Sequence, residues 1–226
     1  GFGIDVVVDL PGVGENLADH PGVDLDVGYR GDARLEPRLH TIATLRASGT
    51  AHDAPPDLMF WAQDPPAKSP AFYFDPILLK PTSRGAIRIR STDPAAAPEI
   101  RLPGITEPSD IARCVEGYAI GIELANHPAI RALCTDPAPA PPASADEARR
   151  RIAENAYSNP HVVGTCAMGP DAAAGAVVDA NGRVHGIDGL RVVDASIIPA
   201  PPTGFPHIIA IMVAEHIAAR WNGSAA

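Results

Sequence analysis

The sequence predicts a mixed α+β protein in which an antiparallel sheet is packed with helices, and three observations support this fold class. First, 226 residues with 46% hydrophobic content are enough to bury the core of one large domain or two small ones. Second, apolar and charged side chains alternate in residues 86–91, AIRIRS, which is typical of a strand with one solvated face. Third, the apolar period changes from residue 109 onward to helical spacing.

The first half of the chain contains the predicted strands. Apolar residues 6–8 lead into a Pro11-Gly12 turn, which predicts a short strand, and residues 15–21 then predict an irregular connection. Four later segments are rich in β-branched and aromatic residues and predict the antiparallel sheet, namely residues 23–29, 56–62, 72–81 and 85–91.

Two helices are predicted next. Apolar residues between Ile111 and Ala125 recur at helical spacing, with Ser109 as the expected N-cap and His127-Pro128 as the end. A Pro-Ala segment, residues 136–144, predicts an extended connector. At its end, Ser144 and Glu147 have the spacing of a capping box that opens a second helix.

The last third of the chain predicts turns followed by a terminal helix. The Asn181-Gly182 pair lies between apolar stretches and predicts a tight hairpin, and residues 190–193 predict a further strand. Residues 207–221 predict the last helix, with an apolar face that we expect to start buried and to end exposed.

Charge and cysteine content exclude several classes of protein. The net charge of -9 and the absence of a Lys/Arg cluster exclude a nucleic-acid footprint. Residues 204–221 form the longest apolar stretch, and their charged and histidine residues predict no transmembrane segment. The three cysteines at wide spacing favour reduced thiols and a cytoplasmic location, and no pair has the spacing of a metal site.

His161 is the first candidate for a functional residue. In SNPHVVGTCAMG, residues 158–169, it follows a proline and precedes Gly164, whose missing side chain lets another group approach the backbone. A lone histidine among small residues is also a common structural residue, so the sequence pattern leaves both interpretations open.

The segment PPTGFPHII, residues 201–209, is the second candidate. Pro206 presets the first helical turn, and His207 and Ile208 then present free backbone N–H groups at the positive end of the helix dipole. Such an end favours an anion or a partially anionic heterocycle, although a plain loop-to-helix entry explains the same pattern.

Four segments, in this order, resemble those of the glucose-methanol-choline (GMC) family of flavin-dependent oxidoreductases. They are VVVDLPGVGENLADHP, LLKPTSRGAIRIRSTDP, HVVGTCAMG and GLRVVDASIIP. The resemblance is weakest in residues 23–75 and 127–156. It implies a GMC-type FAD-binding fold without its N-terminal Rossmann portion, whose Gly-rich fingerprint has no counterpart here. The chain therefore looks like the C-terminal part of such an enzyme.

The resemblance also implies a division of the chain. Residues 1–22 correspond to part of the FAD domain, residues 23–156 to the substrate-binding domain, and residues 157–226 to the return to the FAD domain. The implied partners are FAD, a small-molecule alcohol, the missing N-terminal portion and an electron acceptor of unknown kind. The segment PHVVGTCAMGP also resembles the GMC dehydrogenases associated with mycofactocin redox systems.

Site residues follow from the same resemblance. His161 matches the catalytic histidine that accepts the proton of the substrate hydroxyl, a role that suits an imidazole near neutral pH. Asp194 and Ala195 match a dipeptide beside the phosphate and ribityl portion of the flavin. Phe205, Pro206 and His207 match the segment that lies against the isoalloxazine ring, where the helix dipole stabilises negative charge.

One position departs from the family pattern. The family usually has a second His or Asn facing the substrate, and an ungapped count puts Phe205 there, with His207 two residues later. Either a reshaped tip makes His207 the second catalytic residue, or the site uses one histidine and an aromatic wall. We favour the first.

The leading hypothesis is FAD-dependent oxidation of an alcohol, with hydride transfer to flavin N5 and His161 as proton acceptor. Two alternatives remain at this point. The first is a cyanohydrin lyase on the same scaffold. The second is a non-catalytic fragment or subunit of a split flavoprotein.

Overall fold

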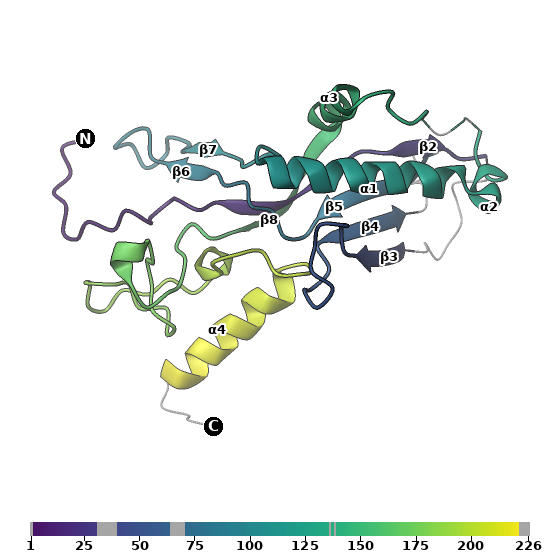
Figure 1. Ribbon diagram of the computed structural model, residues 1–226. Coiled ribbons are helices and arrows are strands. Elements are labelled where there is room, and N and C mark those ends of the chain that lie inside the picture. The colour runs from purple at the N-terminus through teal and green to yellow at the C-terminus, as the bar shows by residue number, and fades with distance from the viewer. Residues whose placement is uncertain (1, 31–39, 64–70, 136, 138, 222–226) are drawn as a thin grey trace. The chain divides into compact units, whose positions relative to one another are not determined.

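A computed structural model describes residues 2–30, 40–63, 71–135, 137 and 139–221. Its helices and strands are labelled in Figure 1. In chain order they are β1 (Ala18–Val23), β2 (Asp26–Gly28), β3 (His40–Leu45), β4 (Leu58–Gln63), β5 (Ala71–Leu78), β6 (Ala86–Arg88), β7 (Glu99–Arg101), α1 (Pro108–Asn126), α2 (Pro128–Arg131), α3 (Ala145–Asn155), β8 (Ala156–Val163), the 3₁₀ turns η1 (Ala172–Ala174) and η2 (Ala195–Ile197), and α4 (His207–Trp221).

The chain folds into two compact units. Unit 1 comprises residues 1–19, 83–104 and 159–226, and unit 2 comprises residues 20–82 and 105–158. Residues 83–104 join unit 1 because Leu17 and Gly85 exchange backbone hydrogen bonds of 3.0 and 2.8 Å, and the Ile87 N–H donates to the Gly14 carbonyl at 2.7 Å. The division into an FAD domain and a substrate-binding domain stays a prediction.

Unit 2 is built on an antiparallel sheet, as the sequence predicts. Strand β4 pairs with β3 on one side and with β5 on the other, and the register puts Trp61 opposite Ile42 and Asp75. On the far side of β5, β2 pairs along residues 71–73, and β1 pairs at Gly22. Burial does not alternate along these strands, because all six residues of β1 and residues 74–78 of β5 are buried.

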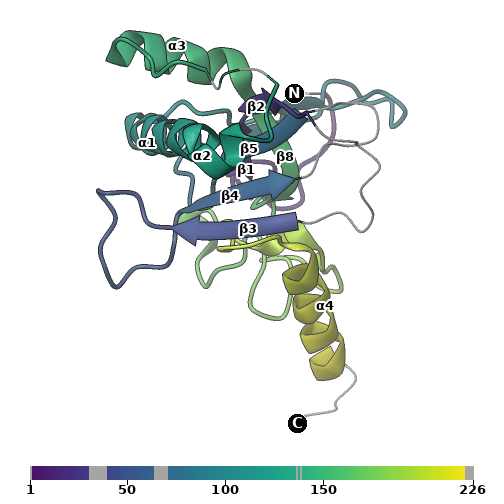
Figure 2. The same ribbon diagram turned by 90° about the vertical axis from the view of Figure 1, so that its right-hand side faces the viewer.

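Helix α1 packs along this sheet, and two glycines allow the close approach (Figure 2). A Cβ added at Gly117 would lie 2.9 Å from the Pro76 Cβ, and one at Gly121 would lie 2.6 Å from a Leu25 methyl carbon. Because backbone and sheet side chains meet here without room for a methyl group, the helix has one fixed position on the strands. The apolar core of unit 2 consists of Val23, Leu25, Val27, Ala47, Leu58, Phe74, Leu78, Cys114, Tyr118, Ile122, Ala125, Cys134 and Ile152.

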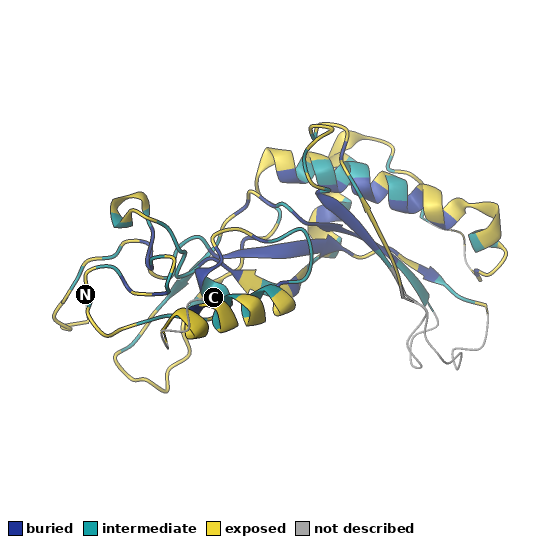
Figure 3. Cartoon of the chain, turned by 90° about the horizontal axis from the view of Figure 1, so that it is seen from below, coloured by how far each residue is buried: buried dark blue, intermediate teal, exposed yellow. Residues whose placement is uncertain are grey.

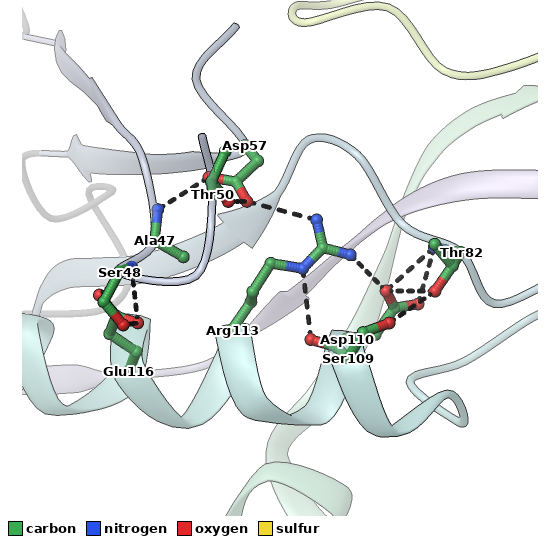
Figure 4. A network of polar contacts seen from close by, with 9 residues as sticks. All are labelled: Ala47, Ser48, Thr50, Asp57, Thr82, Ser109, Asp110, Arg113 and Glu116. Carbon is green, nitrogen blue, oxygen red and sulfur yellow. Dashed lines mark hydrogen bonds and ion pairs between the residues drawn. The ribbon is translucent and has the colours of Figure 1, made fainter. Parts of the chain in front are cut away.

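An ion network fixes the first turns of α1 (Figure 4). The Arg113 guanidinium lies 3.3 Å from Asp57 and 2.6 Å from Asp110, and both carboxylates are buried. Asp110 also accepts the Thr82 backbone N–H at 2.9 Å. Burial alone raises the pKa of Asp57, but hydrogen bonds from Thr50 and Ala47 together with Arg113 outweigh it and hold that pKa below its usual value.

Of the two predicted helix N-caps, Ser144 is confirmed and Ser109 is wrong. The Ser144 side chain accepts the Glu147 N–H at 3.2 Å, as the capping box requires, and Glu147 accepts the Ala143 N–H at 2.8 Å. Ser109 is not the N-cap of α1. That helix begins two residues earlier than predicted, at Pro108 with Glu107 as its N-cap, because proline is well suited to the first helical position and has no N–H to satisfy.

Unit 1 consists mainly of turns and short elements. Strands β6 and β7 form a two-stranded sheet, and Asn181-Gly182 forms the predicted tight turn, with Val178 bridged to Val184 and Gly182 at φ +69°. Its core is small and is completed by the buried Ile217 of α4. That core comprises Val177, Val178, Val184, Ile197 and Ile217.

Four predictions of secondary structure are wrong. Residues 6–8 form no strand, and residues 190–193 form only an isolated bridge at Arg191. Residues 18–21, predicted as irregular, begin β1. Their polar side chains are buried, so the sequence lacks the alternation of apolar and polar residues that indicates a strand with one solvated face. Strand β8 was not predicted, because Pro160 interrupts it. The first turns of α4 are exposed, with Ile208 at 69% (Figure 3).

Candidate active site

His161 lies near the end of β8, in the part of that strand that belongs to unit 1. Its backbone N–H donates a 2.9 Å hydrogen bond to Oδ1 of Asp19, a residue of β1 that is only 2% exposed. The two residues are 142 positions apart in the sequence. A buried carboxylate therefore anchors the backbone of the candidate catalytic histidine.

The turn after His161 is fixed by Asn16. Gly164 has φ +98°, and a Cβ added there would lie 2.4 Å from the Asn16 carbonyl oxygen, so only glycine fits. The Asn16 amide donates to the carbonyls of Gly164 at 3.4 Å and Pro199 at 3.0 Å. Its own oxygen accepts the Arg84 Nε–H at 2.7 Å. Asn16 thus links three segments of unit 1.

The His161 imidazole contacts the ring of Phe205. The ring centroids are 4.6 Å apart, and the planes are inclined by 35°. Desolvation by burial lowers the pKa of His161 below its usual value, and the charge of Asp19 acts in the opposite direction. The neutral, proton-accepting form of the imidazole is therefore the dominant form at neutral pH.

The predicted tip, residues 205–207, has Phe205 and His207 in different surroundings. Pro206 is buried, and its carbonyl accepts the Ala210 N–H at 2.8 Å to begin α4. His207 is exposed at the first position of the helix, and within the described residues its imidazole makes no hydrogen bond, ion pair or ring contact. The structure brings Phe205 to His161. A catalytic role for His207 stays a prediction.

Asp194 and Ala195 lie at the 3₁₀ turn η2. Asp194 is its N-cap and accepts the Ser196 N–H at 2.8 Å. The turn is tied to the segment after His161, because the N–H of Cys166 donates to the Ser196 carbonyl at 2.9 Å and that of Met168 donates to Ile197 at 2.8 Å. The Asp194 side chain is exposed. Contact of either residue with a cofactor stays a prediction.

Sequence reasoning missed Asp19 and Asn16, which position His161 and its turn. Both belong to the segment GENLADHP, residues 14–21, and the available signal was its density of residues that bond the backbone with their side chains. Asn16 adopts φ +56°, a conformation that asparagine tolerates better than most residues. The neighbouring His20 is fully buried.

Unit 1 thus presents a half-buried neutral imidazole beside an aromatic ring at a helix entry. A family model described as GMC oxidoreductase matches residues 81–214, more than half of the chain. The chain belongs to the GMC oxidoreductase family.

Individual relatives agree with this assignment. The chain is 31% identical over 217 residues to an uncharacterised GMC-type oxidoreductase of Rhodococcus erythropolis, covering 96% of this chain and 43% of that protein. It is also 31% identical to an oxygen-dependent choline dehydrogenase of Chromohalobacter salexigens, covering 98% and 46%. Among solved structures, pyridoxine 4-oxidase from Mesorbium loti matches with a TM-score of 0.87 at 26% identity, covering 100% and 46%.

The chain spans about half the length of these relatives, and it corresponds to their C-terminal part. None of the described helices combines the length and the apolarity that a bilayer-spanning helix requires.

Proposed function

We propose that the chain forms the C-terminal part of an FAD-dependent enzyme that oxidises a small alcohol, with His161 as the acceptor of the hydroxyl proton. The contact between His161 and Phe205 supports this most directly, because it puts a neutral imidazole beside the helix entry expected to border the flavin. Membership of an oxidoreductase family supports the reaction class.

The residues fit one edge of a flavin and not the whole cofactor. Helix α4 has 15 residues, and its first backbone N–H groups are free of intrahelical partners, which suits the negative charge that a flavin ring gains on reduction. By contrast, the described residues contain no strand followed by a Gly-rich turn and a helix, the unit that holds the pyrophosphate of dinucleotides. A preceding half would have to supply that unit.

When bound, the flavin supplies a hydride acceptor, which is chemistry that protein side chains lack. His161 takes the proton of the alcohol O–H as the C–H bond gives up its hydride, so that the substrate leaves as an aldehyde or ketone. Because burial lowers the pKa of His161, the imidazole is unprotonated at neutral pH and ready to accept that proton.

Phe205 forms an aromatic wall of the substrate site in this proposal. Its ring restricts the orientation of the imidazole and excludes water from one of its faces. His207 is a second polar group at the helix entry, available to bind the substrate oxygen. Asp194 and Ala195 would border the ribityl and phosphate portion of FAD.

The experiment uses the joined protein, by which we mean this chain linked to the flavin-binding half that precedes it in the enzyme. Choline and pyridoxine are the first alcohols to test, because the names of two relatives contain them. We expect His161→Ala to slow anaerobic flavin reduction at least ~100-fold, the usual loss for a general base. The exposed His52 provides the control, and His52→Ala should leave the rate unchanged.

The alternatives give different outcomes in the same experiment. Cleavage of a cyanohydrin without an electron acceptor, in a protein whose flavin no alcohol reduces, would identify a lyase instead. Stoichiometric FAD bound by this chain alone would contradict the view that it holds only one edge of the cofactor. The cytoplasmic location, the mycofactocin association and the identity of the electron acceptor stay predictions.

A further inference from the structure

Asp19 is a buried acid for which the proposed reaction has no direct use. It lies on β1, the strand beside β8, and is 2% exposed. A carboxylate so far from water must be compensated, since burying a charge is costly unless hydrogen bonds or opposite charges stabilise it. Part of this compensation is the N–H of His161, which donates to Oδ1 at 2.9 Å.

This hydrogen bond acts at the residue where position matters most. The anchored N–H belongs to His161 itself, so Asp19 fixes the point from which the imidazole projects. Contact with Phe205 then restricts the ring from the other end of the side chain. With its backbone anchored and its ring packed, the imidazole has few orientations left, which is the preorganisation that a general base requires.

Other residues also hold the surroundings of this pair. Asn16 and Gly164 hold the turn that follows His161, and Ala18 of β1 packs in a buried cluster with Val163 of β8. The two strands are hydrogen-bonded neighbours in the sheet and also share these apolar contacts. A carboxylate is not needed merely to join them, so its presence opposite His161 has a more specific consequence.

That consequence is electrostatic. The neighbouring strand β1 carries the titratable side chains of Asp19 and His20, and α4 begins with His207 and later carries Glu215, His216 and Arg220. Of these, Asp19 is the one whose charge raises the pKa of His161, against the lowering by desolvation. A negative charge at this place favours the imidazolium that forms when His161 takes a proton.

We propose that Asp19 is a positioning residue for His161, which holds its backbone through the N–H and stabilises its protonated form with a buried negative charge. This inference rests on the proposed function for its catalytic part. The hydrogen bond and the charge are separable, because asparagine keeps an acceptor oxygen in the same place and carries no charge.

Two substitutions separate the two contributions in the joined protein. Asp19→Asn retains an acceptor for the His161 N–H and removes the charge, whereas Asp19→Ala removes both. The exposed Asp53 provides the matched control, as Asp53→Asn. The first measurement is the pKa of the His161 imidazole from the pH titration of its Cε1–H NMR signal, assigned with His161→Ala. The second is the rate of anaerobic flavin reduction at saturating alcohol.

We expect Asp19→Asn to lower the pKa of His161 and to slow flavin reduction about tenfold, with KM changed much less, since the lost interaction strengthens only as the proton is taken. Asp19→Ala should slow reduction further, because the anchor is lost as well, and Asp53→Asn should match the wild type. An unchanged pKa of His161 in Asp19→Asn would overturn the proposal, and so would reduction rates in both Asp19 variants equal to that of the wild type.

Failure of the fold or of the proposed function is distinguishable from failure of this inference. If Asp19→Ala does not fold, the nearly isosteric Asp19→Asn still decides the question. If no alcohol reduces the flavin of the wild type, the proposed function fails, while the NMR titration still measures whether the charge of Asp19 acts on His161.

Discussion

The two units of the chain achieve order in different ways. Unit 2 has a continuous antiparallel sheet, a 19-residue helix packed on it and an extensive apolar core. Unit 1 has short elements and small buried clusters, and its longest helix leaves Ile208 and Met212 69% and 59% exposed. The candidate active-site residues lie in unit 1, where a few polar side chains, above all Asn16 and Asp19, determine the geometry.

This difference shows which substitutions matter in each unit. In unit 2 the backbone is held by packing, and the polar side chains that count are those buried within it. In unit 1 the turns around His161 are held by single hydrogen bonds and by residues at positive φ, so that small changes there should move the site without unfolding unit 2. The following substitutions test this contrast in order of expected effect.

Loss of Arg113 should have the largest effect. Arg113→Leu leaves Asp57 and Asp110 buried without their cation, and we expect the free energy of unfolding to fall by about 3–5 kcal/mol. Urea denaturation measures it. The control is Arg149→Leu, since Arg149 pairs with Asp146 at the surface of α3 and should contribute less than ~1 kcal/mol. Equal effects of the two substitutions would show that the Arg113 network does not stabilise unit 2.

Asp75 should make stability depend on pH. Burial raises its pKa to about 6, helped by the charges of Asp24 and Asp26, although hydrogen bonds from Leu25 and Tyr157 oppose the shift. The folded state then holds a proton that the unfolded state releases near pH 4, so stability should fall as pH rises from about 4 to about 6.

Asp75→Asn should remove this pH dependence and stabilise the protein at pH 7 by on the order of 2 kcal/mol. Denaturation midpoints at pH 4.5 and pH 7 measure it, with Asp53→Asn as the exposed control. A wild-type protein equally stable at the two pH values would be inconsistent with a proton held on Asp75.

Loss of the Asn16 side-chain amide should change the free energy of unfolding less than the substitution of Arg113 or of Asp75. Asn16→Gly keeps the backbone at φ +56° but removes the bonds to Gly164, Pro199 and Arg84, and we expect a loss of about 1–2 kcal/mol. Asn16→Ala should lose about 1 kcal/mol more, since alanine also strains the left-handed backbone. Thermal unfolding with a probe in each unit would show whether unit 1 loosens first, and simultaneous loss of both units would contradict the contrast between them.

Substitutions on the exposed side of α4 should have the smallest effect on this chain. Met212→Lys should change the stability by less than about 0.5 kcal/mol, because the side chain is 59% exposed. Ile217→Ala on the buried side of the same helix should cost about 2–5 kcal/mol. A large effect of Met212→Lys would mean that this face is covered when the chain is folded.

The sequence predicted the regular parts of the fold better than the site. Runs rich in β-branched and aromatic residues indicated β4 and β5, alternation indicated β6, and helical spacing indicated α1 and α4. Patterns failed for β1 and β8, where buried polar residues and a proline hide the strands. Family resemblance pointed to His161 and Phe205. It could not reveal the contact between these two rings or the hydrogen bond from His161 to Asp19, because each pair is far apart in the sequence.

The central claim is that His161, held beside the helix entry, accepts the substrate proton. The most direct test is the pH dependence of anaerobic flavin reduction in the joined protein, compared among wild type, His161→Ala and His207→Ala. We expect the wild-type rate to rise with pH through a pKa below 6.5 and to level off at neutral pH, because burial lowers the pKa of His161. His207→Ala should keep this profile and His161→Ala should lose it. A profile kept by His161→Ala and lost by His207→Ala would contradict the account.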